Sequence, residues 1–67
     1  MIAISLNGAP RQVPPDHTLH DLVEALGLSG QALALAVNRS VVPRLRWAEQ
    51  VLRAQDQVDI VRAIGGG

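Results

Sequence analysis

Large hydrophobic residues alternate with small or polar ones at the start of the chain. Ile2, Ile4 and Leu6 recur at every second position, which is the period of a β-strand with one buried face. Asn7-Gly8 follows at once, and this pair favours a type I′ hairpin turn because both central residues need positive φ angles. A second strand is therefore predicted over residues 9–13, paired with the first. Its proline lacks an N–H donor, so this strand is predicted to lie at an edge of the sheet.

The hydrophobic period then changes to that of a helix. Thr18 is the predicted N-cap, with Asp21 three residues later in a capping-box position, and Gly27 is the predicted residue after the helix end. The apolar positions have the i, i+3, i+4, i+7 spacing of one helix face: Leu19, Leu22, Val23 and Leu26. An isolated helix of this length is marginal in water, so its apolar stripe must pack against the sheet.

The second half of the chain predicts three further strands. Apolar residues alternate over 33–37 and 58–61, a turn at 38–40 leads to a short strand at 41–42, and residues 43–48 suit a single helical turn that starts at a proline. The order hairpin, helix, strand, short strand, strand predicts an α+β, ubiquitin-like β-grasp fold. In this fold one main helix packs across a mixed sheet of four to five strands, and the last strand lies parallel to the first.

Composition narrows the possible functions. With 67 residues, 48% of them hydrophobic and 18% charged, the chain suits one small folded domain. Six arginines balance six acids, so no excess positive charge is available for a nucleic-acid partner. There is no cysteine, which excludes disulfides and thiolate metal sites. No apolar run near the start suggests a signal peptide or membrane span, so we expect a cytoplasmic protein without a membrane partner.

The most informative segment is the end of the chain, Ile64 followed by Gly65, Gly66 and Gly67. We predict a β-grasp domain over 1–64 and a flexible tail over 65–67, because consecutive glycines add nothing to a core. Fully extended, three residues reach about 10 Å, enough to enter a narrow channel in another protein. The alternative is a simple frayed terminus. A glycine tail directly after the last strand of a ubiquitin-like domain favours a reactive C-terminal carboxyl group.

Several segments together resemble the sulfur-carrier proteins of thiamin biosynthesis, the ThiS family. They are Ala36-Val37-Asn38, Val41-Val42-Pro43-Arg44, Trp47-Ala48 and the final run from Asp59 to Gly67. The resemblance covers essentially the whole chain, and the joint occurrence of Val-Pro-Arg-x-x-Trp and the diglycine end is its most specific part. One departure is Gln55-Asp56, where family members usually have Gly-Asp.

The resemblance implies a carrier and co-substrate, not an enzyme. An adenylating enzyme that uses ATP and Mg²⁺ would activate the Gly67 carboxylate, and a sulfur donor such as a cysteine desulfurase system would convert it to a thiocarboxylate. Thiazole synthase would then take the sulfur. The chain itself would bind no cofactor or metal. Gly65 and Gly66 would deliver the reactive group, and Ile64 and Arg62 would contact the partner enzymes.

Other interpretations of the same residues stay open. The chain could carry sulfur for molybdopterin or tRNA thiolation, act as a ubiquitin-like protein modifier, or be a plain binding module. Trp47 suits the core better than a partner anchor, and Arg44 is either a docking residue or ordinary surface charge. His17 and His20 have no acidic cluster beside them, so we assign them no site role.

Overall fold

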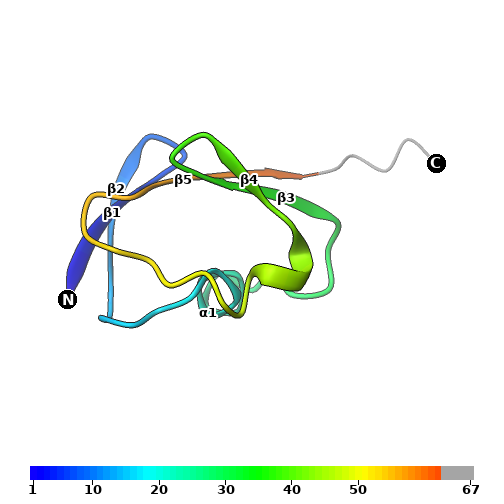
Figure 1. Cartoon of the computed structure of the whole chain (residues 1–67), viewed down its shortest axis with the longest axis horizontal. Coiled ribbons are helices and arrows are strands. Elements are labelled where there is room, and N and C mark those ends of the chain that lie inside the picture. Colours follow the sequence, from blue (N-terminus) through cyan, green and yellow to red (C-terminus); the bar gives the residue numbers. More distant parts are fainter. Residues whose placement is uncertain (63–67) are drawn as a thin grey trace.

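The computed structural model describes residues 1–62, so Ala63, Ile64 and the predicted tail at 65–67 lie outside the described part. Five strands form one mixed sheet, and a helix lies across one of its faces (Figure 1). The elements in chain order are β1 (Ile2–Leu6), β2 (Ala9–Val13), α1 (Leu19–Ala25), β3 (Leu33–Val37), β4 (Ser40–Val42), the 3₁₀ helix η1 (Arg44–Arg46) and β5 (Gln57–Arg62). This arrangement confirms the predicted α+β, β-grasp architecture.

The strand order in the sheet is β2-β1-β5-β3-β4. β5 pairs parallel with β1 and antiparallel with β3, so the last strand lies beside the first, as predicted. β2 forms an edge of the sheet, in agreement with the proline at its second position. β4 and β5 are each longer than the sequence pattern indicated, because Ser40 pairs with Val37 and Arg62 pairs with Leu33.

Four turns hold residues other than glycine at positive φ, and one of them contains Asp16 (φ 65°). Asn7 (φ 50°) precedes Gly8 in the β1–β2 turn, and Asn38 (φ 51°) and Arg39 (φ 69°) form the β3–β4 turn. Asparagine tolerates this region better than most residues, which explains its place in both hairpins. Gln55 has a φ of 71° at the position that departs from the family pattern. The departure therefore places a side chain where glycine is conformationally favoured.

Both predicted ends of α1 are confirmed. The Thr18 hydroxyl accepts a hydrogen bond from the Asp21 N–H, and the Asp21 carboxylate accepts one from the Thr18 N–H, each at 3.1 Å. The bond from the Thr18 N–H to the carboxylate is the main reason that the pKa of Asp21 lies below its ordinary value of 3.8, and the Thr18 hydroxyl lowers this pKa further. At the other end Leu26 is the C-cap, and Gly27 follows at the predicted position with a φ of 72°.

The core lies between α1 and the sheet. Its buried residues are Ile4, Val13, Leu19, Leu22, Val23, Leu35, Val37, Trp47, Leu52 and Val58. Leu52 was not anticipated, because the connection from η1 to β5 has no periodic pattern. Its N–H donates to the His17 carbonyl at 2.8 Å, and this bond holds the connection against the start of α1. Within residues 1–62, no helix has the length and apolar character needed to cross a membrane.

Candidate functional site

β5 is the last described element before the predicted glycine tail, and it ends at Arg62. It lies inside the sheet, with five residues paired to β3 from Val58 to Arg62. On its other side Gln57 and Val58 pair with Ser5 and Leu6 of β1. The strand is therefore held on both sides at its start, and at its end mainly by β3.

Asn38 and Asp56 anchor the first residues of β5. The Asn38 backbone N–H donates to the Gln57 carbonyl at 2.7 Å, and the Asn38 side-chain oxygen accepts from the Gln57 N–H at 3.0 Å. The Asn38 amide group also donates to the Asp56 carboxylate at 3.1 Å, while the other carboxylate oxygen accepts from the Arg53 N–H at 2.8 Å. The β3–β4 turn is thus tied to the turn that starts β5.

A second asparagine anchors β5 farther along. The Asn7 N–H donates to the Val58 carbonyl at 2.9 Å, and the Asn7 side-chain oxygen accepts from the Ile60 N–H at 2.8 Å. The side chain takes the place of a β1 carbonyl just where the backbone of β1 turns away. The sequence indicated Asn7 only as a turn residue. Its contact with a residue 53 positions later depends on tertiary structure.

Of the predicted site residues, the structure places only Arg62. It is the last residue of β5, its side chain is exposed, and it forms no ion pair within residues 1–62. Ile64, Gly65, Gly66 and Gly67 lie outside the described residues, so their predicted roles stay predictions.

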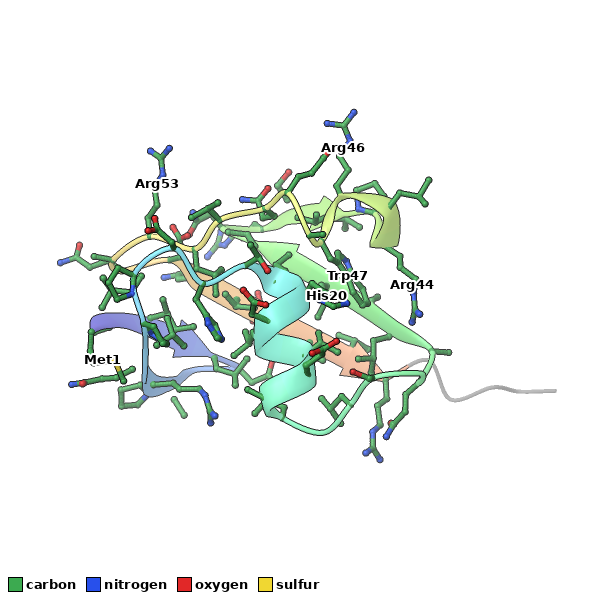
Figure 2. The ribbon with its side chains drawn as sticks, turned by 90° about the horizontal axis from the view of Figure 1, so that it is seen from below. Met1, His20, Arg44, Arg46, Trp47 and Arg53 are labelled. Atoms are coloured by element: carbon green, nitrogen blue, oxygen red, sulfur yellow. The ribbon has the colours of Figure 1, made fainter. Side chains whose placement is uncertain are left out.

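Trp47 belongs to the core, as the sequence indicated. Only 4% of its surface is exposed, and its indole N–H donates to the Val42 carbonyl at 2.9 Å. Arg44 lies over the ring at 4.8 Å from the centroid and donates to the Gln31 carbonyl. Figure 2 shows Trp47 and His20 near α1, with Arg44 extending from η1. Arg44 therefore packs against the body and is not simply a solvated charge.

The histidines form no metal site in the described part of the chain. His20 Nε2 lies 3.4 Å from Glu24 Oε1 on the exposed face of α1. No group of three or more His, Asp or Glu side chains capable of holding a metal ion exists among residues 1–62. The same residues contain no buried charged or polar side chain of the kind that catalytic centres use.

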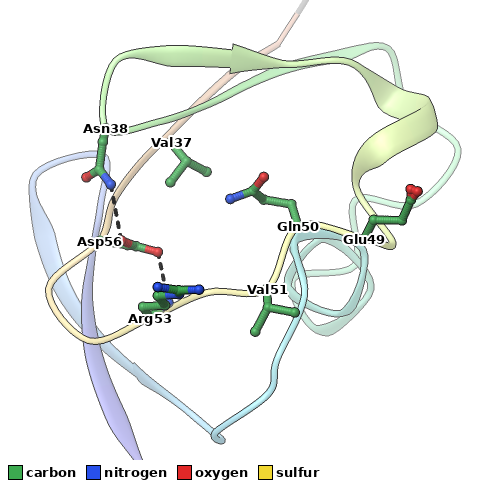
Figure 3. Close-up of a pocket in the computed structure, with 7 residues that line it drawn as sticks. All are labelled: Val37, Asn38, Glu49, Gln50, Val51, Arg53 and Asp56. Carbon is green, nitrogen blue, oxygen red and sulfur yellow. Dashed lines mark hydrogen bonds between the residues drawn. The ribbon is translucent and has the colours of Figure 1, made fainter.

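A hollow of about 420 Å³ lies beside the β3–β4 turn (Figure 3). Its polar lining includes Asn38 and Asp56, which hydrogen-bond to each other as part of the β5 anchor. The hollow adjoins the first of the 6 residues of β5, whereas the predicted tail begins three residues after the last of them. At about 3.3 Å per residue, the first and last residues of the strand are roughly 17 Å apart. The hollow therefore lies at the opposite end of β5 from Arg62.

The chain matches known proteins both in sequence and in fold. The ThiS family model matches residues 4–67. The chain is 34% identical over 64 residues to the sulfur carrier protein ThiS of Escherichia coli K12, covering 96% of this chain and 97% of that protein. It is 38% identical over 64 residues to a thiazole synthase of Magnetococcus marinus, covering 96% of this chain but only 20% of that protein. The crystal structure of the thiamine biosynthesis protein ThiS from Geobacter metallireducens superposes with a TM-score of 0.81 at 22% identity, covering 98% of this chain and 100% of that one.

Proposed function

Because the chain belongs to the ThiS family and is a sulfur carrier of thiamin biosynthesis rather than an enzyme, we propose that the Gly67 carboxyl group carries the sulfur. The observation that supports this most directly is the family match, which extends from residue 4 through Gly67. The described residues supply no competing reactive centre, since they hold neither a metal-ligand cluster nor a buried charged side chain.

The proposed chemistry has two steps. The Gly67 carboxylate attacks the α-phosphorus of ATP on a partner adenylating enzyme, so pyrophosphate leaves and an acyl-adenylate forms. Sulfur supplied at the oxidation level of hydrosulfide then attacks the acyl carbon, AMP leaves, and a thiocarboxylate remains. Activation is needed because a free carboxylate is a poor electrophile. ATP and Mg²⁺ are held by the partner. A cysteine desulfurase system is the proposed source of the sulfur, and a thiol reductant releases its persulfide sulfur as hydrosulfide while being oxidised to a disulfide.

The body of the carrier presents the tail. β5 is fixed as far as Arg62 by β3, Asn38 and Asn7. Gly65 and Gly66 have no side chains that would obstruct a narrow channel, and Ile64 and Arg62 contact the partner beside its entrance. Thiazole synthase is the acceptor of the sulfur. The requirement for ATP favours the cytoplasm as the place of reaction.

Intact-mass spectrometry tests the proposal. The purified chain is incubated with the adenylating enzyme, Mg²⁺, ATP and sulfide, and we expect a gain of about 16 Da from the replacement of oxygen by sulfur. Oxidation of Met1 gives a similar gain, so the shift must map to the C-terminal peptide and require ATP. A variant without Gly67 is the matched control. No shift, under conditions in which the Escherichia coli carrier is modified, would disprove the proposal.

A further inference from the structure

β5 is paired on both sides over its first residues but only on one side over its last. The ladder with β1 ends at the pair Leu6–Val58, after which the chain turns away at Asn7 with a φ of 50°. Figure 1 shows β5 continuing beyond the β1–β2 hairpin. On the β1 side, the Asn7 side chain adds one bond, to the Ile60 N–H. Beyond the Ile60 N–H, this side of β5 has no neighbouring strand, although β5 is an inner strand of the sheet.

Two backbone groups form this open edge. Residues 58, 60 and 62 direct their N–H and C=O groups toward β1, since the Val58 carbonyl and the Ile60 N–H both bond to Asn7. The Ile60 carbonyl and the Arg62 N–H point the same way, and neither has a hydrogen-bond partner within residues 1–62. The N–H and C=O groups of residues 59 and 61 point the other way, toward β3. We name the Ile60 carbonyl and the Arg62 N–H the β5 edge.

The other edges of the sheet are poor templates for an added strand. β2 contains Pro10, which has no N–H to donate, and β4 is only 3 residues long. The β5 edge has no such protection, and only two residues of the sequence separate it from the predicted tail at 65–67. A protein that receives the tail must pass beside it.

We infer that the β5 edge pairs by β-strand addition with an extended segment of thiazole synthase, an inference that rests on the proposed function. Main-chain pairing of this kind supplies affinity without a preformed pocket. The choice of thiazole synthase is supported by two thiazole synthases, from Magnetococcus marinus and Paramagnetospirillum magneticum, in which 20% and 19% of the length matches this chain. In these two proteins a carrier-like segment and the enzyme are parts of one polypeptide. The surface of the segment and that of the enzyme are therefore held close together.

The side chains beside the β5 edge define the chemistry of the added segment. Val61 lies on the face of the sheet away from α1 and is 62% exposed, next to Ala34 of β3. Arg62 is exposed and has no ion-pair partner in the described chain. Because neighbouring residues of paired strands contact each other on each face, the segment has an apolar residue facing Val61 and an acidic residue facing Arg62.

A pair of substitutions at one position tests the backbone bond. Both Arg62→Pro and Arg62→Ala remove the charged side chain, but only Arg62→Pro also removes the backbone N–H. Neither breaks the ladder with β3, because the Arg62 N–H points away from it. We expect Arg62→Pro to raise the Kd for purified thiazole synthase about fivefold or more above that of Arg62→Ala, as the loss of one hydrogen bond predicts. Equal Kd values for the two variants would overturn the inference.

Amide exchange of the wild-type chain gives a second test that needs no variant. In the free carrier the Arg62 amide should exchange rapidly, and in the complex with thiazole synthase it should be protected at least about tenfold. Unchanged protection of this amide in the complex rejects strand addition at the β5 edge. Thiocarboxylate formation on the adenylating enzyme is measured in parallel for all chains. If it occurs while both edge tests fail, only the inference falls; if it fails in every chain, the proposed function falls.

Discussion

Asn7 combines two functions in the fold, and substitutions can separate them. Its backbone adopts the positive φ of the β1–β2 turn, and its side-chain oxygen accepts the Ile60 N–H at 2.8 Å. Asn7→Gly keeps the turn but removes the acceptor. Asn7→Asp keeps the acceptor and tolerates the positive φ. Asn7→Ala removes the acceptor and also disfavours the positive φ. The three variants therefore report the turn and the side-chain bond individually.

The magnitudes follow from the two contributions. Loss of the hydrogen bond to a half-buried strand should cost about 1 kcal/mol, since water can reach the freed N–H. Holding alanine at positive φ should cost about 1 to 2 kcal/mol more. We expect Asn7→Gly to lose about 1 kcal/mol of unfolding free energy, Asn7→Ala about 2 to 3, and Asn7→Asp less than about 0.5. For a domain of this size each kcal/mol lowers Tm by roughly 4 to 8 °C.

Urea and thermal denaturation followed by circular dichroism give these free energies, and amide exchange locates the change. In Asn7→Gly the Ile60 amide should exchange faster, whereas the Val61 amide, which faces β3, is the internal control. The reasoning is refuted if Asn7→Gly is as stable as the wild type with the Ile60 amide unchanged. It is also refuted if Asn7→Ala is no less stable than Asn7→Gly.

Three further predictions concern stability. Gln55→Gly should stabilise the fold by about 0.5 to 1 kcal/mol because it relieves a φ of 71°, whereas Gln55→Ala should not; equal Tm values for the two variants would contradict this. Trp47→Phe should cost about 1 to 3 kcal/mol in urea denaturation by removing the bond to the Val42 carbonyl, and wild-type stability in this variant would count against that bond. The pKa of Asp21 is lowered in the folded state by its bonds to Thr18, so its stabilising effect is complete above the unfolded value and is lost as pH falls through the folded one. Stability measured from about pH 5 downward should therefore fall less steeply in Asp21→Asn, and parallel curves would disprove the linkage.

Local patterns in the sequence were sufficient for most of the elements. The alternation at the start, the helical spacing from Leu19 and the Asn7-Gly8 turn each depend on neighbouring residues, and all three are confirmed. The capping box of Thr18 and Asp21 is equally local and is also confirmed. Strand ends were less accurate, because Arg62 belongs to β5 only through its pairing with Leu33 on another strand.

The candidate site also combines features that depend on the sequence alone with features that depend on tertiary structure. The sequence by itself determined the glycine tail and the family resemblance, because both reside in residue types and their order along the chain. Tertiary structure alone decided that Asn7 and Asn38 hold β5, that Leu52 is buried, and that the β5 edge is open on one side. These features depend on contacts between residues far apart in the chain. Hydrophobic periodicity carries no information about which distant backbone group a side-chain amide will reach, or where a neighbouring strand will end.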